Sequence, residues 1–95
     1  MDLELIKTFE EGTLNLKGFD HKKHLYIAYV YLNTFPRRMA IEKYCGHLKD
    51  LLDKNGYGWK FSRPITESYF DKLDVAMKQN PKSSFDEVVE LLNPK

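Results

Sequence analysis

The chain has 95 residues, which is enough for one domain built around one hydrophobic core. Hydrophobic residues make up 42% and charged residues 31%, a globular composition that argues against disorder across the middle of the chain. The 15 Lys and Arg nearly balance the 14 Asp and Glu, so no overall field attracts nucleic acid or an anionic membrane. We therefore expect a single domain over residues 1–95, without a nucleic-acid partner.

Cysteine use and hydropathy favour a cytoplasmic protein that does not bind membranes. Cys45 is the one cysteine of the sequence, so no intrachain disulfide can form, which is typical of a reducing compartment. The first residues, Met1-Asp2-Leu3-Glu4, lack the basic-then-apolar order of a signal peptide. The longest strongly apolar stretch, Leu25 to Leu32, is far shorter than the ~20 residues that a membrane-spanning helix needs.

Apolar residues at helical spacing begin near the N-terminus with Leu5, Ile6 and Phe9. Asp2 can cap this helix, and Gly12 suits the left-handed conformation that ends it. Residues 13–18 then form a connector whose leucines can pack against the core.

Asp20 is a good N-cap for a second helix, because its carboxylate can accept hydrogen bonds from the first-turn backbone N–H groups. From Leu25 to Leu32 the apolar residues lie on nearly every side, which is typical of a central helix. Pro36 ends this helix or opens the next one, for which we expect Thr34 to be the cap.

A third helix is expected from about Pro36 to Lys54, where Asn55-Gly56 closes it. Its inward stripe consists of Ile41, Tyr44, Leu48, Leu51 and Leu52. The loop from Tyr57 to Phe61 is unusually aromatic, and we expect it to fold back over the bundle.

The fourth helix should begin at Ser62 or Arg63, because Pro64 can occupy its first turn, and Asn80-Pro81 should end it. The residues expected to form its inward line are Ile65, Tyr69, Leu73 and Ala76.

Ser84 and Glu87 match a capping box for a short last helix that ends before Pro94. Its apolar face would consist of Phe85, Val88, Val89 and Leu92. With no competing strand pattern, the sequence predicts an all-α fold, a compact single-domain bundle of four to five helices.

Two histidines stand at the start of the second helix. His21 and His24 are three residues apart, so they share a helical face directed at the edge of the core. A helix N-terminus and partial burial both disfavour imidazolium, which keeps the rings neutral as a base or a ligand requires. The alternative is a structural role, with both rings bonded to loop backbone. Because zinc uses three or four protein ligands, we expect no metal, and no other cofactor, at this pair.

Parts of the sequence resemble a family of small, uncharacterised bacterial helical proteins. Residues 9–14 read F-E-E-G-T-L, and residues 19–32 contain H-K-K-H-L-Y-I-A-Y-V-Y-L, similar to the family pattern H-x-x-H-L-x-x-A-x-x-Y-L. The family's later motif Y-H-E-T-x-T falls on residues 61–66, where Thr66 is kept. Ser62 and Arg63 stand where that motif has histidine and glutamate. The resemblance implies the helical fold and assigns no activity.

The sequence leaves two functions open. The first is a non-catalytic interaction or assembly module that binds a protein partner or a second copy of the chain. The aromatic share of 14% and the absence of standard catalytic motifs favour it. Its mark would be an exposed apolar patch that includes Trp59, Phe61 or Phe85.

The alternative is a ligand-binding or enzymatic domain with a histidine-lined pocket where the second and fourth helices begin. The candidate pocket residues are His21, His24, Ser62, Arg63 and Thr66. Arg63 would neutralise a small anionic ligand, and a histidine would act as base or hydrogen-bond acceptor. Further candidates are Cys45 and His47 as a third member, and Tyr29 or Tyr31 as pocket lining.

Overall fold

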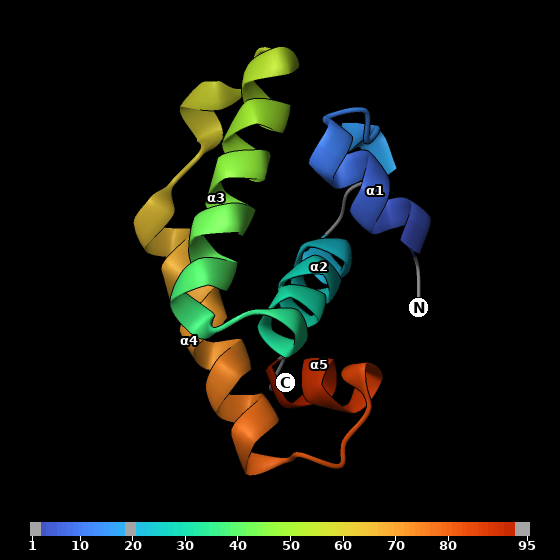
Figure 1. Cartoon of the computed structure of the whole chain (residues 1–95), viewed down its shortest axis with the longest axis vertical. Coiled ribbons are helices and arrows are strands. Elements are labelled where there is room, and N and C mark those ends of the chain that lie inside the picture. The colour runs from blue at the N-terminus through green and yellow to red at the C-terminus, as the bar shows by residue number, and fades with distance from the viewer. Residues whose placement is uncertain (1–2, 19–20, 93–95) are drawn as a thin grey trace.

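The fold is all-α, as the sequence predicts. In a computed structural model of the chain, which describes residues 3–18 and 21–92, five α-helices and two short 3-10 helices form a compact bundle without a strand (Figure 1). The elements are α1 (Leu3–Glu11), η1 (Leu16–Gly18), α2 (His21–Thr34), α3 (Arg37–Lys54), η2 (Gly58–Lys60), α4 (Arg63–Gln79) and α5 (Phe85–Leu92).

Local sequence signals set most of the helix ends. Gly12 after α1 and Gly56 after α3 have φ angles of 75° and 79°, a left-handed conformation that favours glycine. The capping box before α5 is formed in both directions. The backbone N–H of Ser84 donates to Oε1 of Glu87 at 2.8 Å, and the backbone N–H of Glu87 donates to the Ser84 hydroxyl at 3.3 Å.

The expected cap of α3 is wrong. The hydroxyl of Thr34 donates to the carbonyl of Val30 at 2.7 Å, so Thr34 is bonded within the last turn of α2. Pro36 takes the N-cap position without a side-chain hydrogen bond, and its carbonyl accepts from the N–H of Ala40 at 2.9 Å. The other two expected caps, Asp2 and Asp20, lie outside the described residues, as does Pro94.

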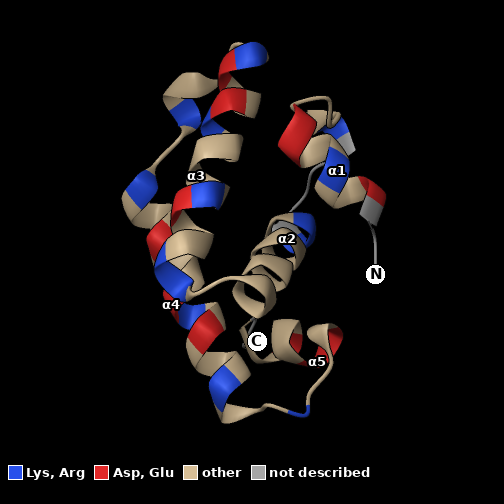
Figure 2. Ribbon diagram, viewed as in Figure 1, with Lys and Arg blue, Asp and Glu red and all other residues tan. Residues whose placement is uncertain are grey.

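Helix α2 is central, because it contacts α3, α4 and α5. Beyond its start it is almost free of charged residues, whereas charges of both signs alternate along the outer faces of α3 and α4 (Figure 2). Leu25, Ile27, Ala28 and Tyr31 of α2 are all buried. In the part of the chain that the structure describes, no helix is both long and apolar enough to cross a membrane.

Four rings connect α1, α2, α3 and α4 through the centre of the bundle. We call Phe9, Tyr31, Tyr44 and Phe70 the aromatic core. The ring centroid of Phe9 lies 6.4 Å from that of Tyr31 and 5.3 Å from that of Tyr44, and Tyr44 meets Phe70 edge-on at 5.1 Å. Edge-on ring pairs add to the stability that burial alone provides.

The expected inward line of α4 is wrong in its first two turns. Ile65 and Tyr69 are 58% and 42% exposed, and the buried stripe passes instead through Thr66, Phe70 and Leu73. Thr66 can be buried because its hydroxyl donates to the carbonyl of Ser62 at 2.9 Å, which satisfies the polar group within the helix. A hydroxyl bonded in this way makes threonine a core residue, while Ile65 and Tyr69 turn toward the surface.

Candidate functional site

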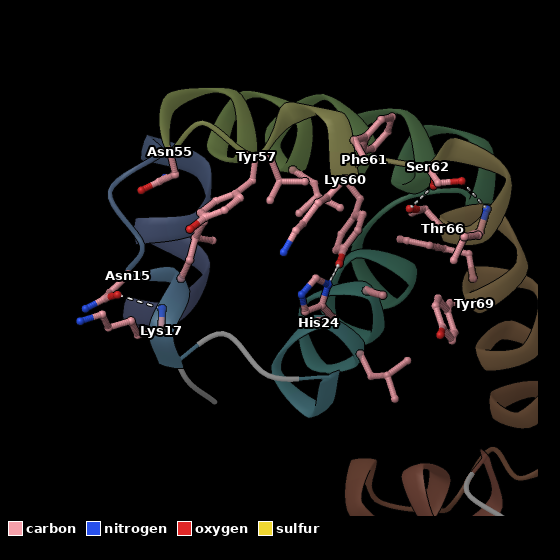
Figure 3. A pocket seen from close by; sticks show the side chains of 18 residues that line it. Asn15, Lys17, His24, Asn55, Tyr57, Lys60, Phe61, Ser62, Thr66 and Tyr69 are labelled. Atoms are coloured by element: carbon pink, nitrogen blue, oxygen red, sulfur yellow. Dashed lines mark hydrogen bonds between the residues drawn. The ribbon is translucent and has the colours of Figure 1, made fainter.

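A cavity of about 800 Å³ opens between α2, α3 and α4, with η1 and η2 at its rim (Figure 3). This volume lies within the range of ~300–1000 Å³ that is typical of small-molecule sites. The apolar residues that line it include Leu16, Leu25, Ala28, Leu48, Leu52, Phe61, Ile65 and Phe70. The polar ones are Asn15, Lys17, His24, Tyr44, Asn55, Tyr57, Lys60, Ser62, Thr66 and Tyr69.

Small side chains keep the cavity open where α2 faces the start of α4. Ala28 lies on α2, Ser62 precedes α4, and Thr66 lies in its first turns. None of the three is long enough to reach across the gap between the helices. The bundle is therefore close-packed at the aromatic core and hollow beside it.

His24 lies in the first turn of α2, and its ring is half-buried in the cavity wall. Its Nδ1 is 3.1 Å from the hydroxyl oxygen of Tyr44, and burial raises the pKa of Tyr44 well above its usual range. The two groups form a hydrogen bond that orients the imidazole at the cavity wall.

Lys60 brings a positive charge into the cavity from η2. Its Nζ lies 4.8 Å from the centroid of the Tyr57 ring and 5.3 Å from that of the Trp59 ring, so cation–π contacts hold the ammonium. Figure 3 shows this amine directed into the cavity, toward the ring of His24. No carboxylate in the described ranges lies within salt-bridge distance of the Lys60 ammonium.

A second lysine lies at the far end of the cavity. Lys17 stands beside Asn15, whose Oδ1 accepts a hydrogen bond from the backbone N–H of Lys17 at 2.9 Å. Figure 3 places this pair on the opposite side of the cavity from Thr66 and Tyr69. Of the lining residues that the structure describes, none is acidic, so the formal charges at the cavity wall are positive.

Ser62 and Thr66 line the cavity, but their hydroxyls also build the start of α4. The hydroxyl of Ser62 accepts from the backbone N–H of Ile65 at 3.5 Å, and that of Thr66 donates to the Ser62 carbonyl. With Pro64 in the first turn, these contacts fix where α4 begins. The sequence pattern thus places His24, Ser62 and Thr66 at one cavity, where the structure also brings them together.

Arg63 lies outside the cavity, although the sequence hypothesis expected it to neutralise an anionic ligand there. Its guanidinium pairs with Glu42 of α3 and, at 2.8 Å, with Glu67 of α4. The Arg63 guanidinium also lowers the pKa of the Glu42 carboxyl. The positive charge at the cavity comes from Lys60 instead. The remaining candidate, His21, begins α2, but its side chain lies outside the described residues.

Neither Cys45 nor His47 lines the cavity. Cys45 is buried on α3, and burial raises the pKa of its thiol, which disfavours the reactive thiolate. His47 is half-buried, and its ring meets that of Phe9 edge-on with centroids 5.9 Å apart. Both residues therefore belong to the packing of α3.

Tyr29 and Tyr31 do not line the cavity either. The ring of Tyr29 packs against Phe85 of α5 at a centroid distance of 5.2 Å. Tyr31 is buried, and its hydroxyl donates to Oε2 of Glu10 at 2.6 Å, which joins α2 to α1. The tyrosine beneath the histidine is Tyr44, which comes from α3.

The sequence hypothesis did not place Lys60 or Tyr44 in the pocket. A signal for Lys60 was present, because it lies within the aromatic loop that was expected to fold back over the bundle. Tyr44 was predicted to lie on the inward stripe of α3. Its spacing from Leu48 indicates burial of the ring but does not indicate that the hydroxyl reaches the cavity.

Within the described residues, no three His, Cys, Asp or Glu side chains lie close enough together to hold a metal ion. Comparison with protein-family models, with curated proteins and with solved structures found no match to this chain. The resemblance to small bacterial helical proteins therefore stays a prediction, and the cavity is the feature that bears on function.

Proposed function

We propose that this chain is a non-catalytic binding domain that takes a small organic molecule with an apolar body into the cavity between α2, α3 and α4. The observation that carries the proposal is the cavity, whose volume is about 800 Å³ and whose walls are largely aliphatic and aromatic. Burial of apolar ligand surface against such walls supplies most of the binding free energy of typical small-molecule sites.

The arrangement of the polar groups favours binding over catalysis. The hydroxyl of Thr66 is bonded to the backbone of Ser62, and the hydroxyl of Tyr44 lies against His24. Nucleophilic catalysis needs an activated nucleophile beside a base, and the thiol of Cys45 lies outside the cavity with a raised pKa. The polar groups therefore serve to position a ligand in this proposal.

We place this binding in the cytoplasm, and we propose that the chain belongs to the small bacterial helical proteins that its motifs resemble. The buried free thiol of Cys45 suits a reducing compartment. Both statements are independent of the binding proposal.

A neutral fluorescent probe, N-phenyl-1-naphthylamine, tests the binding proposal. We expect its emission to rise and shift to the blue on addition of the folded protein, because the apolar cavity excludes water from the dye. Replacement Ala28→Phe should fill the cavity from α2 and weaken probe binding at least tenfold. Ala28→Leu provides a milder filling variant if the phenylalanine disturbs folding, and thermal melts of each variant report on the fold.

Val75→Phe is the matched control, because Val75 is an exposed residue of α4 that does not line the cavity. It adds the same ring to the surface and should leave probe affinity unchanged. Absence of probe binding to the unaltered protein, or equal affinity in folded Ala28→Phe, Ala28→Leu and Val75→Phe variants, would contradict the proposed function.

A protein-interaction module is the second candidate, and one observation favours it. Trp59 is 78% exposed at η2, next to the cavity rim. Of the other residues expected in an exposed patch, Phe61 is half-buried, and Phe85 packs edge-on against Tyr26 at 5.2 Å. Self-association would appear in light scattering as a dimer that Trp59→Ser disrupts, whereas a monomer at all concentrations would exclude the homodimer.

A further inference from the structure

Resting on the proposed function, we infer that the cavity takes an elongated organic acid with a single carboxylate, which Lys60 and His24 bind while the hydrocarbon body lies between α2 and α4. Three features carry this inference: the sign of the charge in the cavity, the position of that charge, and the apolar channel beside it.

The sign of the charge favours an anion. Lys17 and Lys60 are the charged residues among the described lining, and no described acidic residue lines the cavity. Some basic residues elsewhere on the surface pair with carboxylates, as Arg63 does with Glu42 and Lys78 with Asp74 at 3.1 Å. A ligand carboxylate would give Lys60 the counter-charge that the described residues do not supply.

The position of the charge favours one carboxylate group rather than a more highly charged anion. The single ammonium of Lys60 points at the ring of His24, while Lys17 lies at the other end of the cavity (Figure 3). The ammonium lies over the faces of the Tyr57 and Trp59 rings, which hold it by cation–π contacts. A carboxylate can bind the ammonium without displacing these contacts. A charge-assisted hydrogen bond from Lys60 therefore balances one negative charge.

The start of α4 adds to the positive potential at this place. Ser62 lines the cavity as the N-cap of α4, so the positive end of that helix dipole lies at the cavity wall. His24 occupies the first turn of α2, and its Nδ1 is engaged by Tyr44. This contact orients the imidazole beside the ammonium.

The apolar channel receives the hydrocarbon body. Leu25 and Ala28 of α2 form one wall, and Phe70 of α4 lies opposite, with all three buried. Ile65 and Tyr69 continue the apolar surface to the mouth of the cavity and are partly exposed there. The hydrocarbon body would cover part of these two exposed side chains.

Calorimetric titration with decanoate and with decanol tests the assignment, because the two probes share a hydrocarbon chain and differ in charge. We expect the unaltered protein to bind decanoate at least about tenfold more tightly, since one charge-assisted hydrogen bond is worth about this factor. Lys60→Met should abolish most of this preference while it leaves decanol affinity unchanged, and Lys60→Arg should restore it.

Lys72→Met is the matched control, since Lys72 is an exposed residue of α4 outside the cavity and its loss changes the net charge equally. This variant, and Lys17→Met at the far end, should keep the preference for decanoate. Equal binding of decanoate and decanol to the unaltered protein would overturn the carboxylate assignment and leave the binding function intact. A preference lost in Lys17→Met and kept in Lys60→Met would also overturn it. Absence of binding by both probes would instead overturn the proposed function.

Discussion

The aromatic core and the cavity share helices α2, α3 and α4, yet they differ in packing. In the aromatic core, Phe9, Tyr31, Tyr44 and Phe70 meet ring to ring and are almost fully buried. In the cavity, small residues such as Ala28 and Thr66 leave α2 and the start of α4 apart. Tyr44 belongs to both regions, because its ring packs in the core and its hydroxyl reaches His24 at the cavity wall.

This difference indicates a division of roles. Close packing in the aromatic core stabilises the bundle, since each ring there removes a large apolar surface from water. The stability of that core allows the neighbouring region to form an open cavity, although its walls forgo dispersion contacts with protein. The comparison predicts that changes in the core lower stability, while changes in the cavity alter binding.

The largest effect is expected for Phe9→Ala. Phe9 is 0% exposed and contacts Tyr31, Tyr44 and His47, so its truncation should lower the free energy of unfolding by about 3–5 kcal/mol. Urea denaturation measures this loss. Trp59→Ala, which removes an exposed ring, is the control and should change stability by no more than about 0.5 kcal/mol. Similar losses for both variants would remove the distinction between core and surface rings.

Alkaline pH should destabilise the protein through two buried tyrosines. Burial raises the pKa of Tyr31 and of Tyr44, so both phenols stay protonated in the native state at a pH where the unfolded chain ionises. Because the native state then binds more protons, the contribution of these phenols to stability is constant below pH ~10 and falls above it by about 1.4 kcal/mol per pH unit for each tyrosine.

Denaturant titrations between pH 8 and pH 11.5 check this dependence. The double variant Tyr31→Phe/Tyr44→Phe should show a shallower fall above pH ~10. Cys45, whose thiol pKa is also raised, adds to the fall in stability in both proteins. An unchanged slope in the double variant would show that these phenols ionise in the folded state as readily as in the unfolded chain.

The single tyrosine variants separate the two regions. Tyr31→Phe removes the hydrogen bond to Glu10 and should cost about 1 kcal/mol of stability, without an effect on decanoate affinity. Tyr44→Phe removes the hydroxyl that orients His24, so decanoate affinity should fall several-fold. Thermal melts and calorimetry distinguish the two outcomes. Loss of affinity in Tyr31→Phe alone would place the binding site outside the cavity.

The smallest effect is expected for Arg63→Met. Arg63 is exposed and paired with Glu42 and Glu67, and exposed ion pairs contribute little to stability. Since its guanidinium lies outside the cavity, both the melting temperature and decanoate affinity should stay within error of the unaltered protein. A marked loss of decanoate affinity would show that Arg63, and not Lys60, binds the carboxylate.

Helix boundaries were largely predictable because their determinants are local. Gly12, Gly56 and the Ser84–Glu87 capping box act within a few residues, and each ends or begins a helix where the pattern indicates. The exposed side of α4 was not predictable in this way. Hydropathy favours burial of Ile65 over burial of Thr66. It does not take into account the hydrogen bond to the Ser62 carbonyl, which makes Thr66 compatible with burial.

The cavity was predictable in part. His24, Ser62 and Thr66 stand at helix starts, and the prediction that the starts of α2 and α4 face each other places them together. The contributions of Lys60 and Tyr44 depend on how η2 and α3 pack, which sequence spacing does not encode. The prediction for Arg63 was wrong because its side chain points away from the cavity and pairs with the carboxylate of Glu42.

Amide chemical shifts during a decanoate titration show, residue by residue, where the ligand binds. If the ligand occupies the cavity, the amide signals of Leu25, Ala28, Lys60 and Thr66 shift and saturate together, while that of Val88 in the α5 part of the core does not move. Shifts confined to the exposed apolar residues Val75 and Leu91, or no saturable shifts at the cavity, would contradict the account.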